Sequence, residues 1–269
     1  MRNVLVAFGV LSGLVQLYAA LWSDILVDQL LLLAALAAVA VAWGLWRAWP
    51  RSRISRDLGT PEVKVGIAVG DLFRQDAHLV VGFTDVFDTD MSTGEIIDPR
   101  SVQGQFQTRV YAGDTDRLDR DLAQELGEIP VQYTERPEDK PRGKRERYPI
   151  GTVAVLGDSS RRYFCVAYTE MQNNLVAKSS VDHLWHALSS LWRAVHEKGH
   201  RQTVAIPVIG TELARINCLD RESLLKMILL SFVAQSREEV VCRELIVVIH
   251  PKDYQRINIL EVAAFLRQL

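Results

Sequence analysis

The sequence lacks the short motifs that mark several common kinds of catalytic and nucleotide-binding site. It contains no G-x-S-x-G nucleophile elbow, no phosphate loop with its lysine, and no G-x-G-x-x-G fingerprint. Serine hydrolase chemistry and ATP hydrolysis therefore have no local support. The function must be sought in less regular features of the chain.

Cysteine is scarce, and positive and negative charges nearly balance. Cys165, Cys218 and Cys242 form no C-x-x-C pair, and each lies in or beside an apolar segment. This favours buried free thiols in a reducing compartment, and it disfavours a reactive thiolate. The formal net charge of -2 over 269 residues gives no basic face on which to predict nucleic-acid binding.

One formal metal motif is present, but its context argues against it. The segment from His196 to His200 reads H-E-K-G-H, and such a pair binds zinc only when both histidines face one side of a continuous helix. Gly199 is instead expected to end the helix, so that His200 leaves the helical face. We expect cationic side chains at a helix C-terminus here, with no metal and no cofactor.

Two long apolar runs open the chain, at residues 4–22 and 25–46. Both reach the ~20 residues that span a bilayer, and Trp22 and Trp46 fit interfacial aromatic belts. A cleaved signal peptide and a buried core hairpin are the alternatives. The first run is long for a signal peptide, and neither run has the polar face of a core helix. We therefore predict a transmembrane helical hairpin over residues 1–49.

The charges around these runs predict their orientation. The connection between them contains Asp24 and Asp28 but no lysine or arginine, whereas arginines follow the second run between residues 47 and 56. The positive-inside rule then places both chain ends in the cytoplasm and the hairpin in the cell inner membrane. Residues 50–61 are expected to be a basic linker near lipid headgroups, and residues 62–269 a cytoplasmic domain.

From residue 62 onward, strand-like and helix-like segments alternate. Strands are expected at 63–69, 78–83, 152–156, 163–167, 203–208 and 245–249. Helices are expected after Asp114, Ser180 and Asp220, which are good N-caps, and over residues 254–269. This alternation predicts an α/β layered fold that binds its ligand near the carboxyl ends of the strands.

Residues 135–147 read ERPEDKPRGKRER and are charged and rich in proline. Such a composition favours a mobile surface loop. We interpret this segment as a solvated excursion and assign it no binding role.

Two strand ends have the composition of a ligand-binding turn. In IPVIGTELARIN, residues 206–217, an apolar strand stops at Gly210 and a polar helix start follows, which is the usual shape of a phosphate cradle. The other turn is GDL at residues 70–72, after the first strand of the domain. Glu212 is unusual in this setting, because a carboxylate beside a phosphate is repulsive unless it points away or meets a cation.

The chain resembles the macro domains, modules that bind ADP-ribose and related nucleotides. The resemblance covers about residues 60–269 and is closest to the macro domain of Thoeris anti-phage effectors. It depends on the segments GDLF, SVQGQF at 101–106, AKSSVDHLW at 177–185 and IGTELARIN. Two membrane helices before such a domain also match the membrane-anchored Thoeris effectors. The implied fold is a macro-domain-like three-layer α/β/α sandwich with a mixed central sheet.

The resemblance also implies which residues contact the ligand. Asp71 would accept a hydrogen bond from the adenine amino group, loop 102–106 would follow the distal ribose and diphosphate, and the amides of 210–214 would bind the diphosphate. Phe83 or Phe106 would stack on a base or ribose, with burial in the core as the alternative. The implied ligand-binding residues are Asp71, Leu72, Phe83, Gln103, Gly104, Gln105, Phe106, Gly210, Thr211, Glu212, Leu213, Ala214 and Arg215.

The sequence departs from the family pattern at two places. Macro domains that hydrolyse ADP-ribosyl bonds typically have an asparagine pair after the second strand, where this chain reads GFTDVF at 82–87. This difference favours binding over catalysis. Glu212 stands where a glycine is usual, and we hypothesise that it contacts a positively charged substituent of the ligand. An amino-acid conjugate such as histidine-linked ADP-ribose would offer one.

The resemblance thus predicts a membrane-anchored anti-phage effector that is not an enzyme. An ADP-ribose-derived signal from a TIR-domain partner would bind the macro-like domain and promote formation of a homo-oligomer. Clustered hairpins would then disrupt the lipid bilayer and cause abortive infection. The alternatives are a membrane-tethered ADP-ribosyl hydrolase and a non-catalytic membrane scaffold.

Overall fold

The computed structural model describes residues 53–59, 62–210 and 219–269. By its internal contacts the chain divides into residues 1–51 and residues 52–269. The two predicted membrane spans lie outside the described residues, and the hairpin stays a prediction. Within the described ranges, no helix combines the length and the apolar character that crossing a bilayer requires.

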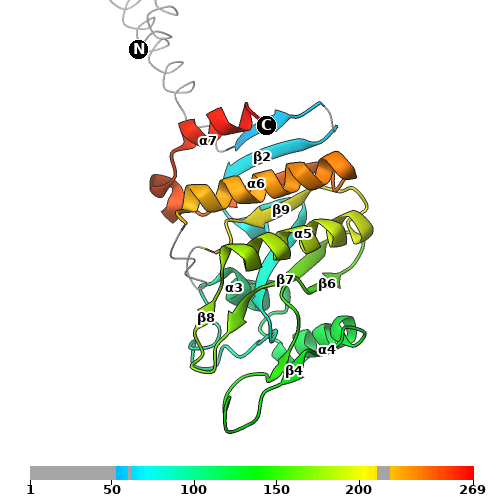
Figure 1. The fold of residues 1–269 in the computed structure, drawn as a ribbon, viewed down its shortest axis with the longest axis vertical. Coiled ribbons are helices and arrows are strands. Elements are labelled where there is room, and N and C mark those ends of the chain that lie inside the picture. Colours follow the sequence, from blue (N-terminus) through cyan, green and yellow to red (C-terminus); the bar gives the residue numbers. More distant parts are fainter. Residues whose placement is uncertain (1–52, 60–61, 211–218) are drawn as a thin grey trace, which may run out of the picture. The chain divides into compact units, whose positions relative to one another are not determined.

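A mixed sheet forms the centre of the domain (Figure 1). Its strands are β1 (Arg53–Asp57), β2 (Lys64–Val69), β3 (His78–Thr84), β6 (Val153–Gly157), β7 (Arg162–Met171), β8 (Ala177–Lys178), β9 (Val204–Pro207) and β10 (Glu244–Ile249). The spatial order is β1-β2-β10-β9-β3-β7-β6, with β8 paired to β7. The run from β2 to β7 is parallel, whereas β1, β6 and β8 pair antiparallel. Five parallel strands therefore end at one edge of the sheet.

Helices cover both faces of this sheet. They are η1 (Leu72–Arg74), α3 (Val102–Val110), α4 (Thr115–Leu126), α5 (Val181–Lys198), α6 (Arg221–Glu238), η2 (Pro251–Arg256) and α7 (Ile259–Leu266). Side chains of α5, α6 and α7 form one buried cluster with the sheet, and those of α3 and α4 form another on the opposite face. The described part of the chain is thus a three-layer α/β/α arrangement, as the sequence predicted.

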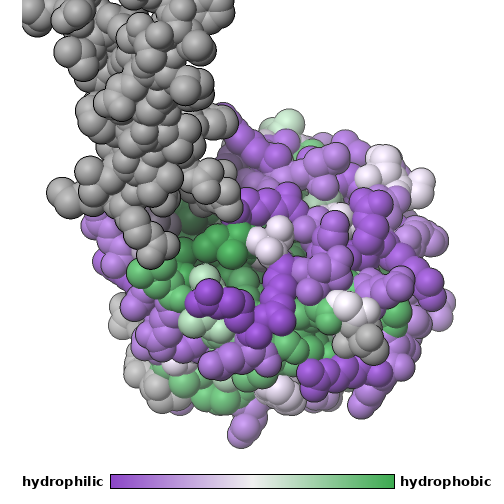
Figure 2. Space-filling model, turned by 90° about the horizontal axis from the view of Figure 1, so that it is seen from above, coloured by the Kyte–Doolittle hydropathy of each residue, from purple (hydrophilic) through white to green (hydrophobic). Residues whose placement is uncertain are grey.

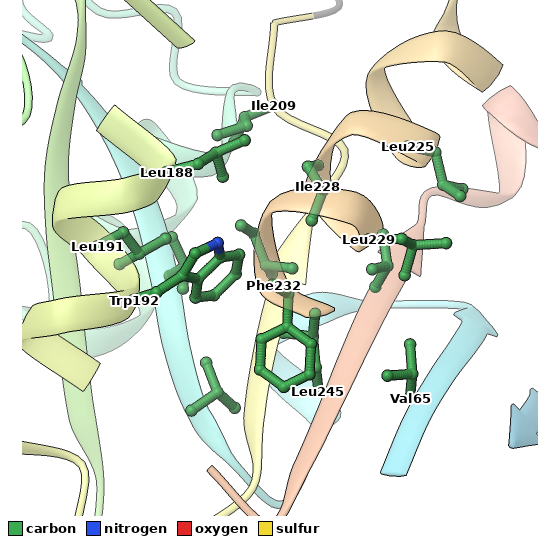
Figure 3. Close-up of a cluster of buried hydrophobic side chains, with 14 of the residues drawn as sticks. Val65, Leu188, Leu191, Trp192, Ile209, Leu225, Ile228, Leu229, Phe232 and Leu245 are labelled. Atoms are coloured by element: carbon green, nitrogen blue, oxygen red, sulfur yellow. The ribbon is translucent and has the colours of Figure 1, made fainter. Parts of the chain in front are cut away.

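Alternation along the strands explains the two clusters, because successive side chains of a strand point to opposite faces. Val80 of β3 belongs to the α5–α6 cluster and Val81 to the α3–α4 cluster, and Phe164 and Cys165 of β7 divide in the same way. The α5–α6 cluster is centred on Trp192 and the aliphatic side chains around it (Figure 3). The burial of these apolar side chains is the main stabilising contribution to the domain.

The helix starts predicted from capping residues are confirmed. The side chains of Asp114, Ser180 and Asp220 each accept a hydrogen bond from the amide three residues on, at the starts of α4, α5 and α6. Gly199 ends α5, and its amide donates to the carbonyl of Val195 at 2.7 Å. These are interactions between near neighbours in sequence, which is why local patterns predicted them.

Three segments differ from expectation. Residues 53–57, assigned to the linker, form β1 because their backbone pairs with β2. Residues 102–106, expected as a loop, belong to α3, which the Ser101 side chain caps by accepting from the Gly104 amide at 3.0 Å. The single helix expected over 254–269 is broken, because Ile257 is extended and Asn258 caps a new helix, α7.

The interpretation of residues 135–147 as a solvated excursion holds for most of the segment, but two of its cations are buried. The segment closes a small antiparallel pair, β4 (Tyr133–Thr134) with β5 (Glu146–Arg147). Lys140 and Arg147 are 0% and 5% exposed, because both cations meet carboxylates of the main domain. Composition alone could not distinguish these buried charges from solvated ones.

The face seen in Figure 2 has apolar side chains lying among hydrophilic ones. It is the end of the domain that includes α7. Val262 and Leu266 of α7 are buried, whereas Leu260 is 82% exposed. Helix α7 therefore uses only part of its apolar surface for packing against the described domain.

Gly104 gives a test of the packing around α3. A Cβ at this position would lie 2.4 Å from the carbonyl oxygen of Asp98 and 2.7 Å from Cα of Pro99. Because these are backbone atoms, Gly104→Ala should reduce the free energy of unfolding by about 1–3 kcal/mol, the usual cost of overpacking. Urea denaturation of the purified protein measures this.

Gly70→Ala is the matched control, since its Cβ would meet nothing within 4 Å. This variant should change the free energy of unfolding by less than about 0.5 kcal/mol. Equal stability of the two alanine variants would contradict the packing role assigned to Gly104.

Candidate functional site

Three adjoining cavities lie along the edge where the parallel strands end. Their volumes are about 210, 590 and 330 Å³. All three are lined by Val102 at the start of α3 and by Pro207 at the end of β9, so they form one cleft. The carboxyl edge of a parallel sheet is the usual position for ligands in α/β folds.

The first cavity, here called the Asp71 cavity, lies beyond the end of β2. Asp71 caps η1 by accepting from the Phe73 amide at 2.9 Å, and Arg109 of α3 donates to both of its carboxylate oxygens at 3.0 and 2.8 Å. The Arg109 guanidinium also lies 4.7 Å above the Phe73 ring. Burial by itself would raise the pKa of Asp71, but the Arg109 and Phe73 hydrogen bonds lower it overall. The carboxylate is thus ionised, and one third of the side chain stays exposed.

The middle cavity, here called the basic cavity, has three cationic side chains. Arg100, Arg221 and Lys252 line it together with the carboxylates of Asp98 and Asp253. Arg100 bonds to Asp98 at 2.9 Å and Arg221 to Asp253 at 3.0 Å. Among the described residues, the lining of this cavity thus has two arginines and a lysine beside two carboxylates, and arginine suits the geometry of phosphate oxygens.

The third cavity, here called the β3–β7 cavity, has polar groups among its lining residues. Thr84, Thr169 and Gln103 are each less than 10% exposed and line it beside apolar side chains such as Ile96 and Met171. Gln103 donates to the carbonyl of Asp88 at 2.6 Å. The Thr84 hydroxyl has no hydrogen-bond partner among the described residues. A buried hydroxyl without a partner is costly, and a ligand group in this cavity would relieve that cost.

Tyr168 lines the same cavity because β7 bulges there. The register of β3 and β7 shifts between Phe83 and Thr84, so that Tyr168 is the additional residue of β7. Such bulges redirect side chains beside functional sites. The ring lies against Gly82 of β3, where a Cβ would be 2.4 Å from the Tyr168 Cε1 atom. Gly82 is therefore needed for the close approach of this ring.

Burial raises the pKa of Tyr168 to about 12, although a hydrogen bond with the Gly210 backbone acts in the opposite direction. Its hydroxyl is therefore protonated at neutral pH and able to donate. No motif in the sequence indicated Thr84 or Tyr168 as part of the site. The one local signal for this site is Gly82, a glycine inside a strand.

The structure brings several of the predicted ligand-binding residues together in the cleft. Those that line it are Asp71, Leu72, Phe83, Gln103, Gln105 and Gly210. Phe106 lines none of the three cavities, because its ring packs in the core against Phe83, Tyr111 and Tyr163. Gly104 is also buried, against the backbone. The predicted residues Thr211, Glu212, Leu213, Ala214 and Arg215 lie outside the described residues.

The H-E-x-x-H segment does not have the geometry of a zinc site. Helix α5 ends at Lys198, and His200 has a φ of 48°, outside the helical range. His196 contacts the Val240 carbonyl at 2.9 Å, whereas the His200 imidazole contacts Arg162 at 3.0 Å. The two imidazoles thus have separate partners, and the predicted end of the helix at Gly199 is confirmed.

The comparison with protein families identifies the domain. The model described as "Thoeris protein ThsA, Macro domain" matches residues 65–250. The chain belongs to this family. The family confirms the resemblance found in the sequence and implies an ADP-ribose-related ligand in anti-phage defence. It also identifies the cleft as part of a ThsA-type macro domain.

Solved structures support the same fold for this ThsA-type domain. Two single-residue variants of the Oceanobacillus iheyensis macrodomain are 14% and 13% identical to the chain, with TM-scores of 0.53 and 0.52. The comparisons cover 82% and 81% of this chain and 97% and 100% of those proteins. The same macrodomain with MES bound is 14% identical, with a TM-score of 0.50 and coverage of 81% and 100%. At such low identity the likeness shows the fold alone. No curated protein matches the chain.

Thr84 provides a test of the polar lining of the β3–β7 cavity. Thr84→Val replaces a buried, unpaired hydroxyl by a methyl group of similar size. Because the desolvation cost of the hydroxyl disappears, the free energy of unfolding should rise by about 0.5–1 kcal/mol. Thermal denaturation without ligand measures the change.

Thr169→Val is the comparison variant, since the Thr169 hydroxyl donates to the Phe83 carbonyl at 3.5 Å. This second variant should be neutral or destabilising. If Thr84→Val destabilises the protein as much as Thr169→Val, the Thr84 hydroxyl has a partner and the interpretation fails.

Proposed function

We propose that this domain is the sensor of an anti-phage effector and that it binds an ADP-ribose-derived signal in the cleft. The observation that carries the proposal is the order of the three cavities along the strand ends. A carboxylate lies at one end, two arginines and a lysine in the middle, and buried hydroxyl and amide groups at the other end.

The chemistry of ADP-ribose matches this order. The adenine amino group is a donor that suits the ionised Asp71. The diphosphate is anionic and suits the basic cavity, where Arg221 lies at the start of α6. The distal ribose has hydroxyl groups that both donate and accept, as the side chains of Thr84 and Gln103 do. The family supports the ligand class, and the chemistry of the three cavities supports the assignment of its parts.

We propose a binding role without hydrolysis. The segment from Gly82 to Phe87 has no asparagine. The last residue of β3 is Thr84, which has a hydroxyl group instead of an amide. Threonine lacks the amide with which asparagine both donates and accepts. Glu212 belongs to the same proposal as a contact for a cationic substituent, such as the histidine of histidine-linked ADP-ribose.

The anchor, the partner and the assembly complete the proposal. The apolar runs at 4–22 and 25–46 would hold the sensor at the inner membrane, a TIR-domain enzyme would make the signal, and homo-oligomerisation would cluster the anchors. These steps rest on the sequence pattern and on family membership. They explain why a nucleotide sensor would follow two apolar segments.

Calorimetric titration with ADP-ribose tests the sensor role. Wild-type protein should bind saturably, and Asp71→Asn should weaken binding about 10- to 100-fold, because a hydrogen bond to a charged group contributes roughly 1.5–3 kcal/mol. Asp76→Asn is the control, since Asp76 is exposed on the same turn and lines none of the three cavities. Absence of binding, or equal losses in the two variants, would reject the proposed site.

Dye release from liposomes tests the membrane step. Full-length protein in liposomes should release an entrapped dye when ADP-ribose or histidine-linked ADP-ribose is added, and Asp71→Asn should need more ligand for the same release. Retention of the dye at saturating ligand would reject membrane disruption but would leave the sensor role intact.

A further inference from the structure

Residues 133–147 form a segment that we call the strap, and its cations bind carboxylates beside the β3–β7 cavity. The strap begins at β4 and ends at β5. Three of the carboxylates that it binds, Asp85, Asp88 and Glu95, follow β3 in sequence, in the segment that leads to α3. Three separate contacts connect the strap to the walls of the cavity.

The first contact is made by Arg147 at the end of β5. Its guanidinium lies 2.5 Å from one oxygen of Asp85, and the other Asp85 oxygen accepts from the Met171 amide at 2.8 Å. Arg147 also donates to the Met171 carbonyl at 2.7 Å. Met171 lines the β3–β7 cavity, whereas Arg147 does not. Arg147 thus fixes the end of β7 on the cavity wall without touching the cavity.

The second contact is a buried ion pair between Lys140 and Asp88. The two side chains are 0% and 1% exposed, and their charged atoms are 3.3 Å apart. Gly143 lets the strap wrap around this carboxylate: it has a φ of 76°, and a Cβ there would lie 2.8 Å from an Asp88 oxygen. The Asp88 carbonyl accepts from Gln103, which lines the cavity. The Lys140 ion pair therefore holds the residue that orients Gln103.

The third contact joins the strap to residues 93–97, which we call the rim of the β3–β7 cavity. Arg142 donates to the Thr93 hydroxyl at 2.9 Å and forms an ion pair with Glu95. Glu95 lines the cavity, and Ile96 and Ile97 follow it there. The three contacts thus connect the strap to the end of β7, to the start of α3 through Asp88, and to the rim.

We infer that the strap holds the β3–β7 cavity in its ligand-binding shape, and that Lys140 and Arg147 are positioning residues for the ligand group that enters this cavity. The inference rests on the proposed function, in which that group is the distal ribose. Neither residue lines the cavity, so each acts through the carboxylate that it binds. Breaking either pair leaves a buried carboxylate without its cation, and the chain must rearrange locally to reach water.

Titrations of full-length protein in detergent with ADP-ribose and with ADP test the inference. Lys140→Met should weaken ADP-ribose binding about ten-fold, a change large enough to resolve. ADP binding should stay within about two-fold, because ADP has no group for the β3–β7 cavity. Arg136→Met is the matched control, since Arg136 is an exposed cation of the same strap whose ion pairs among the described residues are with the strap carboxylates Glu138 and Asp139. Equal losses for both nucleotides, or no loss, would overturn the inference.

Hydrogen exchange gives a readout that needs no ligand. In Lys140→Met, amides of residues 95–104 should exchange faster than in wild type, whereas Arg136→Met should leave them unchanged. Asp88→Asn combined with Lys140→Met should restore slow exchange in part, because the uncompensated charge is gone. Unchanged exchange at 95–104 in Lys140→Met would overturn the inference even if the domain bound no nucleotide.

Arg142→Met decides the case in which Lys140→Met fails to fold. Its side chain is 44% exposed, so the variant should fold, and exchange should quicken at residues 93–97. If exchange there and ADP-ribose affinity both match wild type, the strap does not position the rim. If wild type binds ADP-ribose but not more tightly than ADP, the assigned ribose position fails, and the exchange data alone decide the role of the strap.

Discussion

The parallel register of β2, β10, β9, β3 and β7 is the constraint on which the cleft depends. A parallel ladder brings the carboxyl ends of its strands to one edge, and the first residues after those ends are free of the ladder. Asp71 follows β2, Pro207 ends β9 and Thr84 ends β3, so residues far apart in sequence line one groove. The two buried clusters stabilise this sheet from both faces, and the starts of α3 and α6 line the groove beside the strand ends.

Interactions between near neighbours were predictable, and those between distant residues were not. Helix starts at Asp114, Ser180 and Asp220 depend on a side chain and an amide three residues on, and a pattern within one turn reveals them. The strap contacts join residues 52 and 62 positions apart. The same charged, proline-containing composition is typical of solvated loops, so no sequence pattern indicated that Lys140 would lie in the interior.

The candidate site was predictable to the same limited extent. Asp71 and Gly210 follow strands in a pattern that resembles a known family, and the structure places both in the cleft. Thr84 and Tyr168 were missed because their positions depend on a register shift between two strands, which no pattern along one strand reveals. The hypothesis for Glu212 concerns the segment after Gly210, which lies outside the described residues.

The buried carboxylates of the strap contacts are better explained by the positions that they impose on neighbouring groups than by a gain in the stability of the domain. Burial raises the pKa of Asp85 and of Asp88, although each faces a cation, which means that the ionised forms are costly to desolvate. Apolar side chains of similar volume could stabilise such contacts as well or better. An apolar contact, however, does not fix direction. Asp85 binds the Arg147 guanidinium with one oxygen and the Met171 amide with the other, so a single carboxylate sets both the strap and the end of β7. A cavity that distinguishes hydroxyl groups needs walls placed with that accuracy.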